Sequence, residues 1–161
     1  MKVAIAALIA VSTLGCAFAQ DKAAPAKCAP PPKDLVIKEV APGKGDAAVL
    51  RSAVLVQYTG WLYDGCAKDM KGEQFDTSQG RASPFGFLVG TGNVIKGWDE
   101  GVIGMKVGGK RSLIVPPEKA YGERSVGGGK IPPGSTLVFD VEVVAMPMPG
   151  PPSQGAIQKP Q

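Results

Sequence analysis

Residues 137–144, LVFDVEVV, alternate between two kinds of side chain along their length. The odd-numbered positions are all apolar, whereas Asp140 and Glu142 occupy two of the even-numbered positions. Because successive side chains of a β-strand point to opposite faces, the pattern predicts a strand with one face in a core. A strand with one charged face is typical of an antiparallel sheet that is covered on one side only.

Similar alternation occurs in residues 54–59, in Leu113 and Val115, and in the apolar run of residues 85–89. Turn-forming glycines and prolines separate these runs, and the chain contains 22 glycines and 15 prolines among 161 residues. Together they make up nearly double the usual share of a globular protein. This composition argues against a helix bundle and favours a turn-rich, mostly β chain.

One segment follows helical spacing instead. Ile95, Trp98 and Val102 fall on one face of a helix, and Asp99 and Glu100 fall on the other side. A helix of two turns does not survive alone, so Trp98 must pack into the concave face of the sheet. The predicted fold class is therefore α+β, an antiparallel β-sheet wrapped around one short α-helix.

Charge and residue content narrow the chemistry. The chain contains no histidine, which excludes Ser-His-Asp and Cys-His nucleophiles, histidine general bases and most zinc sites. The net charge of +4 is mild and spread along the chain, which disfavours a nucleic-acid surface.

The first nineteen residues have the features of a secretory signal peptide. Lys2 precedes a short apolar run, and Ala17-Phe18-Ala19 supplies a cleavage site of small residues. The run is too short to span a bilayer, and the sequence predicts an exported, periplasmic protein. Alternatively, Leu14-Gly15-Cys16 partly resembles a lipoprotein cleavage box, in which case Cys16 would carry a lipid anchor.

The mature chain divides into three parts. Residues 20–34 are rich in Ala, Pro and Lys and predict an extended tether. Residues 147–161 are rich in proline and predict a disordered tail. The folded domain is expected at residues 35–146, and no later apolar run is long enough to cross a membrane.

Removal of Cys16 with the signal leaves Cys28 and Cys66. An even number of cysteines in an exported protein favours a disulfide, and two free thiols are the alternative. Two thiols without histidine make an incomplete metal site, so no metal is expected.

Six segments together resemble the FKBP-type peptidyl-prolyl cis-trans isomerases, a family inhibited by immunosuppressant macrolides. They run in the family's order with similar spacings: VQYTG at 56–60, FDTS at 75–78, PFGF at 84–87, VIKGWDEG at 94–101, AYG at 120–122, and IPP at 131–133 leading to LVFDVE at 137–142.

The resemblance implies a five- or six-stranded antiparallel sheet around a short helix, with an apolar pocket between them. Trp98 would form the floor of the pocket, and Asp76 and Tyr121 would be its polar groups. Arg81 matches a family arginine near Asp76. The walls would be Tyr58, Phe75, Phe85, Val94, Ile95, Tyr121, Ile131 and Phe139.

The resemblance also implies the function. The Ile95 N–H and the Tyr121 hydroxyl would hold substrate carbonyls, and Asp76 would position either a carbonyl or the Tyr58 hydroxyl. Rotation about an X–Pro bond makes no covalent bond, so no cofactor is expected. The expected partners are proline-containing polypeptides and macrolide inhibitors, and the expected state is a monomer. A proline-binding chaperone module with little turnover is the alternative function.

The sequence departs from the smallest family members at residues 66–74, where the chain is several residues longer. This insertion is expected to form a bulge beside the pocket. A Cys28–Cys66 bridge would then pin the tether to the pocket rim.

Overall fold

The computed structural model describes residues 28–147. The predicted signal peptide, Cys16, most of the tether and nearly all of the proline-rich tail lie outside these residues. No helix within residues 28–147 combines the length and the apolar character needed to cross a membrane.

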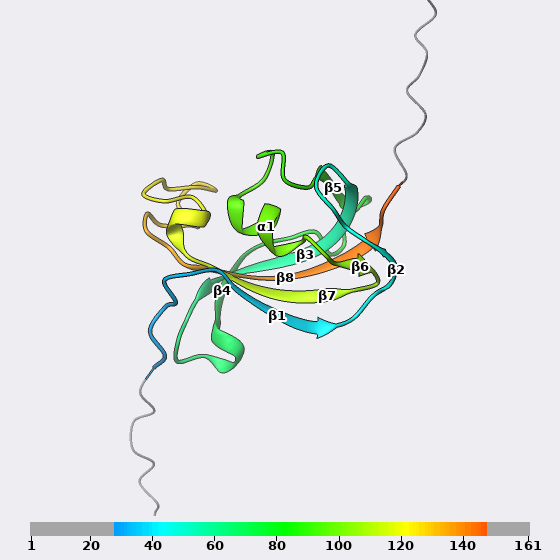
Figure 1. The fold of residues 1–161 in the computed structure, drawn as a ribbon. Helices are drawn as coiled ribbons and strands as arrows, with labels where there is room; N and C mark the ends of the chain where they lie inside the picture. The colour runs from blue at the N-terminus through cyan, green and yellow to red at the C-terminus, as the bar shows by residue number, and fades with distance from the viewer. Residues whose placement is uncertain (1–27, 148–161) are drawn as a thin grey trace, which may run out of the picture.

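A curved six-stranded antiparallel sheet forms the body of the domain (Figure 1). Its strands follow the order β1-β7-β8-β3-β4, and β5 pairs with the first half of β3. The bounds are β1 Val36–Ala41, β3 Ala53–Tyr63, β4 Lys71–Thr77, β5 Phe85–Leu88, β7 Lys110–Val115 and β8 Leu137–Ala145. This arrangement confirms the predicted fold class.

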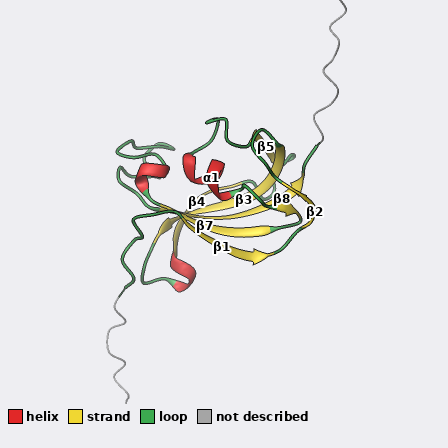
Figure 2. Cartoon of the chain, in the orientation of Figure 1, coloured by secondary structure: helices red, strands yellow, loops and turns green. Residues whose placement is uncertain are grey.

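The remaining elements are short. A two-stranded sheet joins β2, Lys44–Ala47, to β6, Lys106–Val107. Two 3₁₀ turns, η1 at Lys68–Met70 and η2 at Pro117–Lys119, lie in connections. The single α-helix of the described chain, α1 at Lys96–Gly101, is surrounded by loops and turns (Figure 2).

The core lies between α1 and one face of the sheet. In β3 the side chains of Val54, Val56 and Tyr58 are buried, and the intervening residues are only partly covered. On β8 the odd-numbered positions from Leu137 to Val143 are buried in the same way, as the alternation predicts. The antiparallel register places Val141 opposite Tyr58, so both strands contribute to the same core.

The outer face is not uniformly polar, and the structure corrects this part of the prediction. Val138 is fully buried although it lies on the same face as Asp140. Its cross-strand partners are Trp61 and Ile114, and Ile114 in turn pairs with Val36. These four side chains form an apolar row across four strands, and the row covers Val138 from both sides.

Helix α1 lies unusually close to β7 because two glycines face the sheet. A Cβ atom added to Gly97 would lie 2.4 Å from Val115 Cγ1, and one added to Gly101 would lie 2.7 Å from Leu113 Cδ1. The glycines weaken the isolated helix, but they allow its backbone to rest directly on the strand. This contact brings Trp98 down into the core.

Candidate active site

Trp98 lies at the centre of an aromatic cluster between α1 and the sheet. Its side chain is only 4% exposed. Tyr58, Phe85 and Phe139 meet it edge to face, with ring centroids 5.0, 5.9 and 5.4 Å away. Because edge-to-face pairs are favourable, these contacts hold the indole in one orientation.

A cleft of about 520 Å³ opens beside this cluster, within the usual size of a small-ligand site. The family resemblance predicted nine of its lining residues, and five others were not predicted. The predicted ones are Tyr58, Phe75, Asp76, Phe85, Val94, Ile95, Trp98, Tyr121 and Phe139. The others are Gly92, Asn93, Lys96, Ala120 and Arg124.

Two predicted site residues do not line the cleft. Ile131 is buried in the core cluster that contains Trp98, and it exchanges two 3.1 Å backbone hydrogen bonds with Val126. Arg81 is not a lining residue, although its guanidinium binds the carboxylate of Asp76, which is one.

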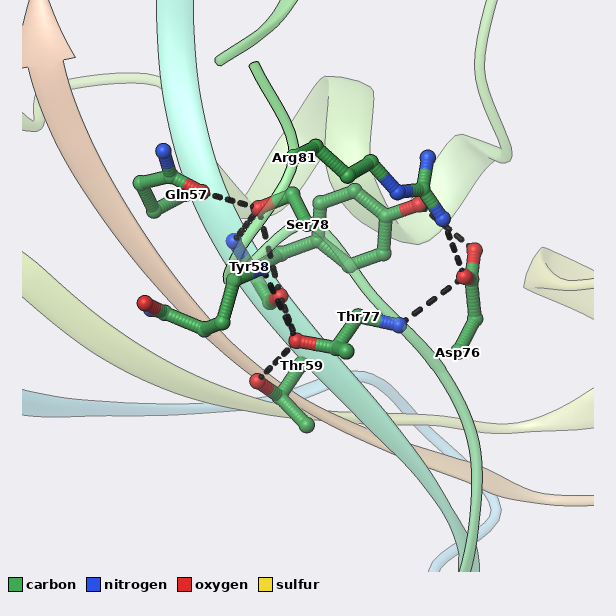
Figure 3. A network of polar contacts seen from close by, with 8 residues as sticks. Gln57, Tyr58, Thr59, Asp76, Thr77, Ser78 and Arg81 are labelled. Carbon is green, nitrogen blue, oxygen red and sulfur yellow. Dashed lines mark hydrogen bonds and ion pairs between the residues drawn. The ribbon is translucent and has the colours of Figure 1, made fainter. Parts of the chain in front are cut away.

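Asp76, in β4, accepts hydrogen bonds from three groups (Figure 3). The Tyr58 hydroxyl donates to Oδ2 at 2.6 Å, the Thr77 N–H donates to Oδ1 at 2.8 Å, and Arg81 donates to Oδ1. The sequence analysis left two roles open for Asp76, positioning a substrate carbonyl or positioning the Tyr58 hydroxyl. This geometry agrees with the second role.

The electrostatics keep Tyr58 protonated. Burial raises the pKa of its hydroxyl to about 12, and the hydrogen bond to Asp76 and the charge of Asp76 add to the effect. The Arg81 guanidinium lies 5.9 Å from the centre of the Tyr58 ring. The Tyr58 hydroxyl is thus a hydrogen-bond donor at neutral pH.

Next to this network, hydrogen bonds of Ser78 hold the segment that follows β4 against β3. Ser78 is fully buried; its N–H donates to the Tyr58 carbonyl at 2.9 Å, and its hydroxyl accepts the Tyr58 N–H at 2.8 Å. The same hydroxyl donates to Gln57 (Figure 3). The sequence analysis did not single out Ser78, because these partners are about twenty residues away and local spacing carries no signal of them.

Tyr121 and Ile95 bring two further donors to the cleft. Burial raises the pKa of the Tyr121 hydroxyl, and the negative charge of Asp76 contributes to the rise. Within residues 28–147 neither the Tyr121 hydroxyl nor the Ile95 N–H donates a hydrogen bond. Both groups can therefore donate to a ligand.

Asp99 orders the loop that leads into α1. Its two carboxylate oxygens each accept a 2.8 Å hydrogen bond, one from the Gly90 N–H and one from the Gly92 N–H. Both glycines have φ of 74°, in the left-handed region that favours glycine. Asp99 thus fixes the loop whose residues Gly92 to Ile95 line the cleft.

The insertion lies in a different place from the one predicted. It forms η1 and the start of β4, and the β3–β4 hairpin that carries it projects from the side of the sheet opposite α1 (Figure 1). No residue between 61 and 74 lines the cleft. A disulfide joins Cys28 to Cys66, with 4.4 Å between their Cα atoms, so the bridge pins the tether to this hairpin instead of to the cleft rim.

Comparison with known proteins gives the family. The profile of the family described as FKBP-type peptidyl-prolyl cis-trans isomerase matches residues 45–144. An FK506-binding protein of Streptomyces anulatus is 48% identical over 116 residues, which cover 72% of this chain and 89% of the relative. An FK506-binding protein of Neisseria meningitidis serogroup A is 46% identical over 110 residues, covering 68% of this chain and 94% of the relative.

Solved structures agree with the fold. FkpA from Escherichia coli matches with a TM-score of 0.59 and 43% identity, over 71% of this chain and 49% of that one. AtFKBP13 matches with a TM-score of 0.58 and 37% identity, over 70% of this chain and 93% of that one. The sheet, the helix and the matched residues together show that this chain belongs to the FKBP-type peptidyl-prolyl cis-trans isomerase family.

Proposed function

We propose that this isomerase assists the folding of exported proteins, and that its cleft lowers the rotation barrier of X–Pro bonds by binding the twisted amide out of water. The observation that carries the proposal is the aromatic cleft itself. Much of its floor and walls consists of aromatic rings packed around Trp98, and two neutral tyrosine hydroxyls and the Ile95 N–H lie among them. Its charged lining residues are Asp76, Lys96 and Arg124.

The chemistry needs no reactive side chain. The rotation barrier of roughly 18–20 kcal/mol comes from amide resonance, which is lost as the bond twists. The twisted amide is less polar than the planar one, so an apolar site that excludes water favours it over the ground state. A thousandfold acceleration requires only about 4 kcal/mol of such preference.

The polar groups orient the substrate within this site. The Ile95 N–H and the Tyr121 hydroxyl are positioned to donate to substrate carbonyls and to hold the proline ring against Trp98. Asp76 acts on the substrate only through another residue, because its carboxylate already accepts hydrogen bonds from Tyr58, Thr77 and Arg81. Asp76 is therefore a positioning residue, which holds the Tyr58 ring in place in the cleft wall through the hydrogen bond from its hydroxyl.

Two features support export as the setting. The Cys28–Cys66 disulfide is typical of proteins that leave the reducing cytoplasm. The secretory signal predicted from residues 1–19 agrees with it. The isomerase domain in this proposal spans residues 35–146, since β1 begins at Val36 and β8 ends at Ala145.

The testing experiment is protease-coupled isomerisation of a Leu-Pro test peptide, with and without an FK506-type macrolide. We expect rate enhancement that the macrolide blocks. Trp98→Leu should abolish most of the activity, whereas Trp61→Leu, on the outer face of β3, should retain it. Tight peptide binding without rate enhancement would instead favour a chaperone module. Equal losses of activity in the two tryptophan variants would show that the cleft around Trp98 is not the site of catalysis.

A further inference from the structure

Two cations on the cleft rim lack an acidic partner. Lys96, the first residue of α1, and Arg124, in the loop after η2, both line the cleft and are exposed. No ion pair within residues 28–147 involves either side chain. Among the described residues that line the cleft, Asp76 is the only acidic one, and Arg81 already forms an ion pair with it.

The other nearby acids are also engaged or face elsewhere. Asp99 accepts the backbone N–H groups of Gly90 and Gly92. Glu100, one turn beyond Lys96, is paired with Lys119. Glu123 precedes Arg124 in the chain but does not line the cleft. The rim therefore carries a net positive charge that the fold leaves uncompensated.

The two cations flank the donors that would hold the substrate. Lys96 directly follows Ile95, and Arg124 Nε lies 3.4 Å from the Tyr121 carbonyl oxygen. A peptide held at the Ile95 N–H and the Tyr121 hydroxyl would place the residues around its proline beside these charges. This step rests on the proposed function.

We propose that Lys96 and Arg124 make the enzyme select substrates with a carboxylate side chain close to the proline. Both cations are exposed, so each contact with a substrate carboxylate should contribute as little binding free energy as a surface ion pair. Salt should weaken it further by screening. The expected preference for an acidic over an isosteric neutral peptide is roughly two- to fivefold in kcat/KM.

The test compares peptides with an unchanged Leu-Pro pair and glutamate, glutamine or lysine at the residue after proline, or two residues before it. The enzyme should prefer glutamate to glutamine, and glutamine to lysine, for at least one of these positions, and added salt should reduce the ratio. The ratio should approach one in Lys96→Gln/Arg124→Gln.

The matched control is Lys38→Gln/Lys106→Gln, which removes two exposed lysines outside the cleft. Its glutamate-to-glutamine ratio should equal that of the unmodified enzyme. Equal rates for all three side chains at both positions would overturn the proposal, as would a preference that persists without Lys96 and Arg124. Failure to isomerise even the glutamine peptides would instead count against the proposed function.

Discussion

The hydroxyl of Tyr58 in β3 donates a 2.6 Å hydrogen bond to Oδ2 of Asp76 in β4, on the strand next to it. The contact joins the aromatic wall of the cleft to the Arg81 ion pair, so one carboxylate organises both. Three groups donate to it, yet its side chain is 41% exposed. These hydrogen bonds therefore stabilise the fold only moderately. Their greater effect is to fix the orientation of the Tyr58 and Arg81 side chains.

A double-mutant cycle measures the coupling between these residues. Asp76→Ala and Tyr58→Phe should each lower stability, and the double variant should lose less than the sum of the two. The expected coupling is about 1 kcal/mol, below the usual value for a hydrogen bond to a charged group because water reaches Asp76. Urea unfolding of the four proteins gives the value, and strict additivity would show that the two residues act independently.

The raised pKa of Tyr58 predicts a pH dependence of stability. The unfolded state releases the tyrosine proton near the ordinary value of 10.0, whereas the folded state holds it to about 12. The contribution is fully present below pH 10 and is lost as the pH rises from 10 through 12. The stability difference between the unmodified protein and Tyr58→Phe should therefore shrink over that interval. A difference that stays constant up to pH 12 would place the hydroxyl in an ordinary environment.

The close contact between α1 and β7 predicts the effect of adding one methyl group. In an exposed helix, Gly→Ala stabilises by up to about 1 kcal/mol. Here Gly101→Ala should instead destabilise by roughly 1–3 kcal/mol, because the new Cβ would lie 2.7 Å from Leu113 Cδ1. Adding Leu113→Val should recover part of the loss. Thermal melts of the three proteins test this, and a stabilised Gly101→Ala would mean that the helix has room to move.

Much of the fold follows from sequence periodicity, because alternation and helical spacing are local. The strand at 137–144, which ends one residue later in the structure, and the helix around Trp98 were predicted from side-chain spacing alone. Contacts between distant segments were not. Ser78 acts through Gln57 and Tyr58, about twenty residues before it in the chain, and only the tertiary structure brings these partners to it.

The site was predicted less completely than the fold. Aromatic motifs in the family's order indicated the cleft, but Lys96 and Arg124 carry no apolar pattern that would mark them as lining residues. The position of the disulfide depended on which way the β3–β4 hairpin projects, and an insertion's length does not determine its direction. The β3–β4 pairing does contain the irregular register of a bulge, between Gly60 and Tyr63, but the insertion does not line the cleft as expected.

Because the disulfide lies away from the cleft, removing it should lower the stability of the domain without changing its activity. The Cys28–Cys66 loop spans 38 residues, and removing such a cross-link costs about 2–4 kcal/mol. Cys28→Ser/Cys66→Ser should lose that stability yet keep its kcat/KM, since the bridge lies outside the cleft. Non-reducing intact mass, two hydrogens below the reduced value, checks the bond in the exported protein. A parallel loss of kcat/KM at a temperature where the variant is folded would tie the bridge to the site.

The most direct test of the account is kcat/KM for a Leu-Pro peptide in H₂O and in D₂O, measured between pH 6 and 9. Tyr58 and Tyr121 both have raised pKa values, so their hydroxyls stay protonated across this range. If the cleft acts by desolvation and shape alone, the profile should be flat and the solvent isotope effect should be about 1. A bell-shaped profile, or an isotope effect of about two or more, would show a proton moving in the rate-limiting step and would contradict the mechanism.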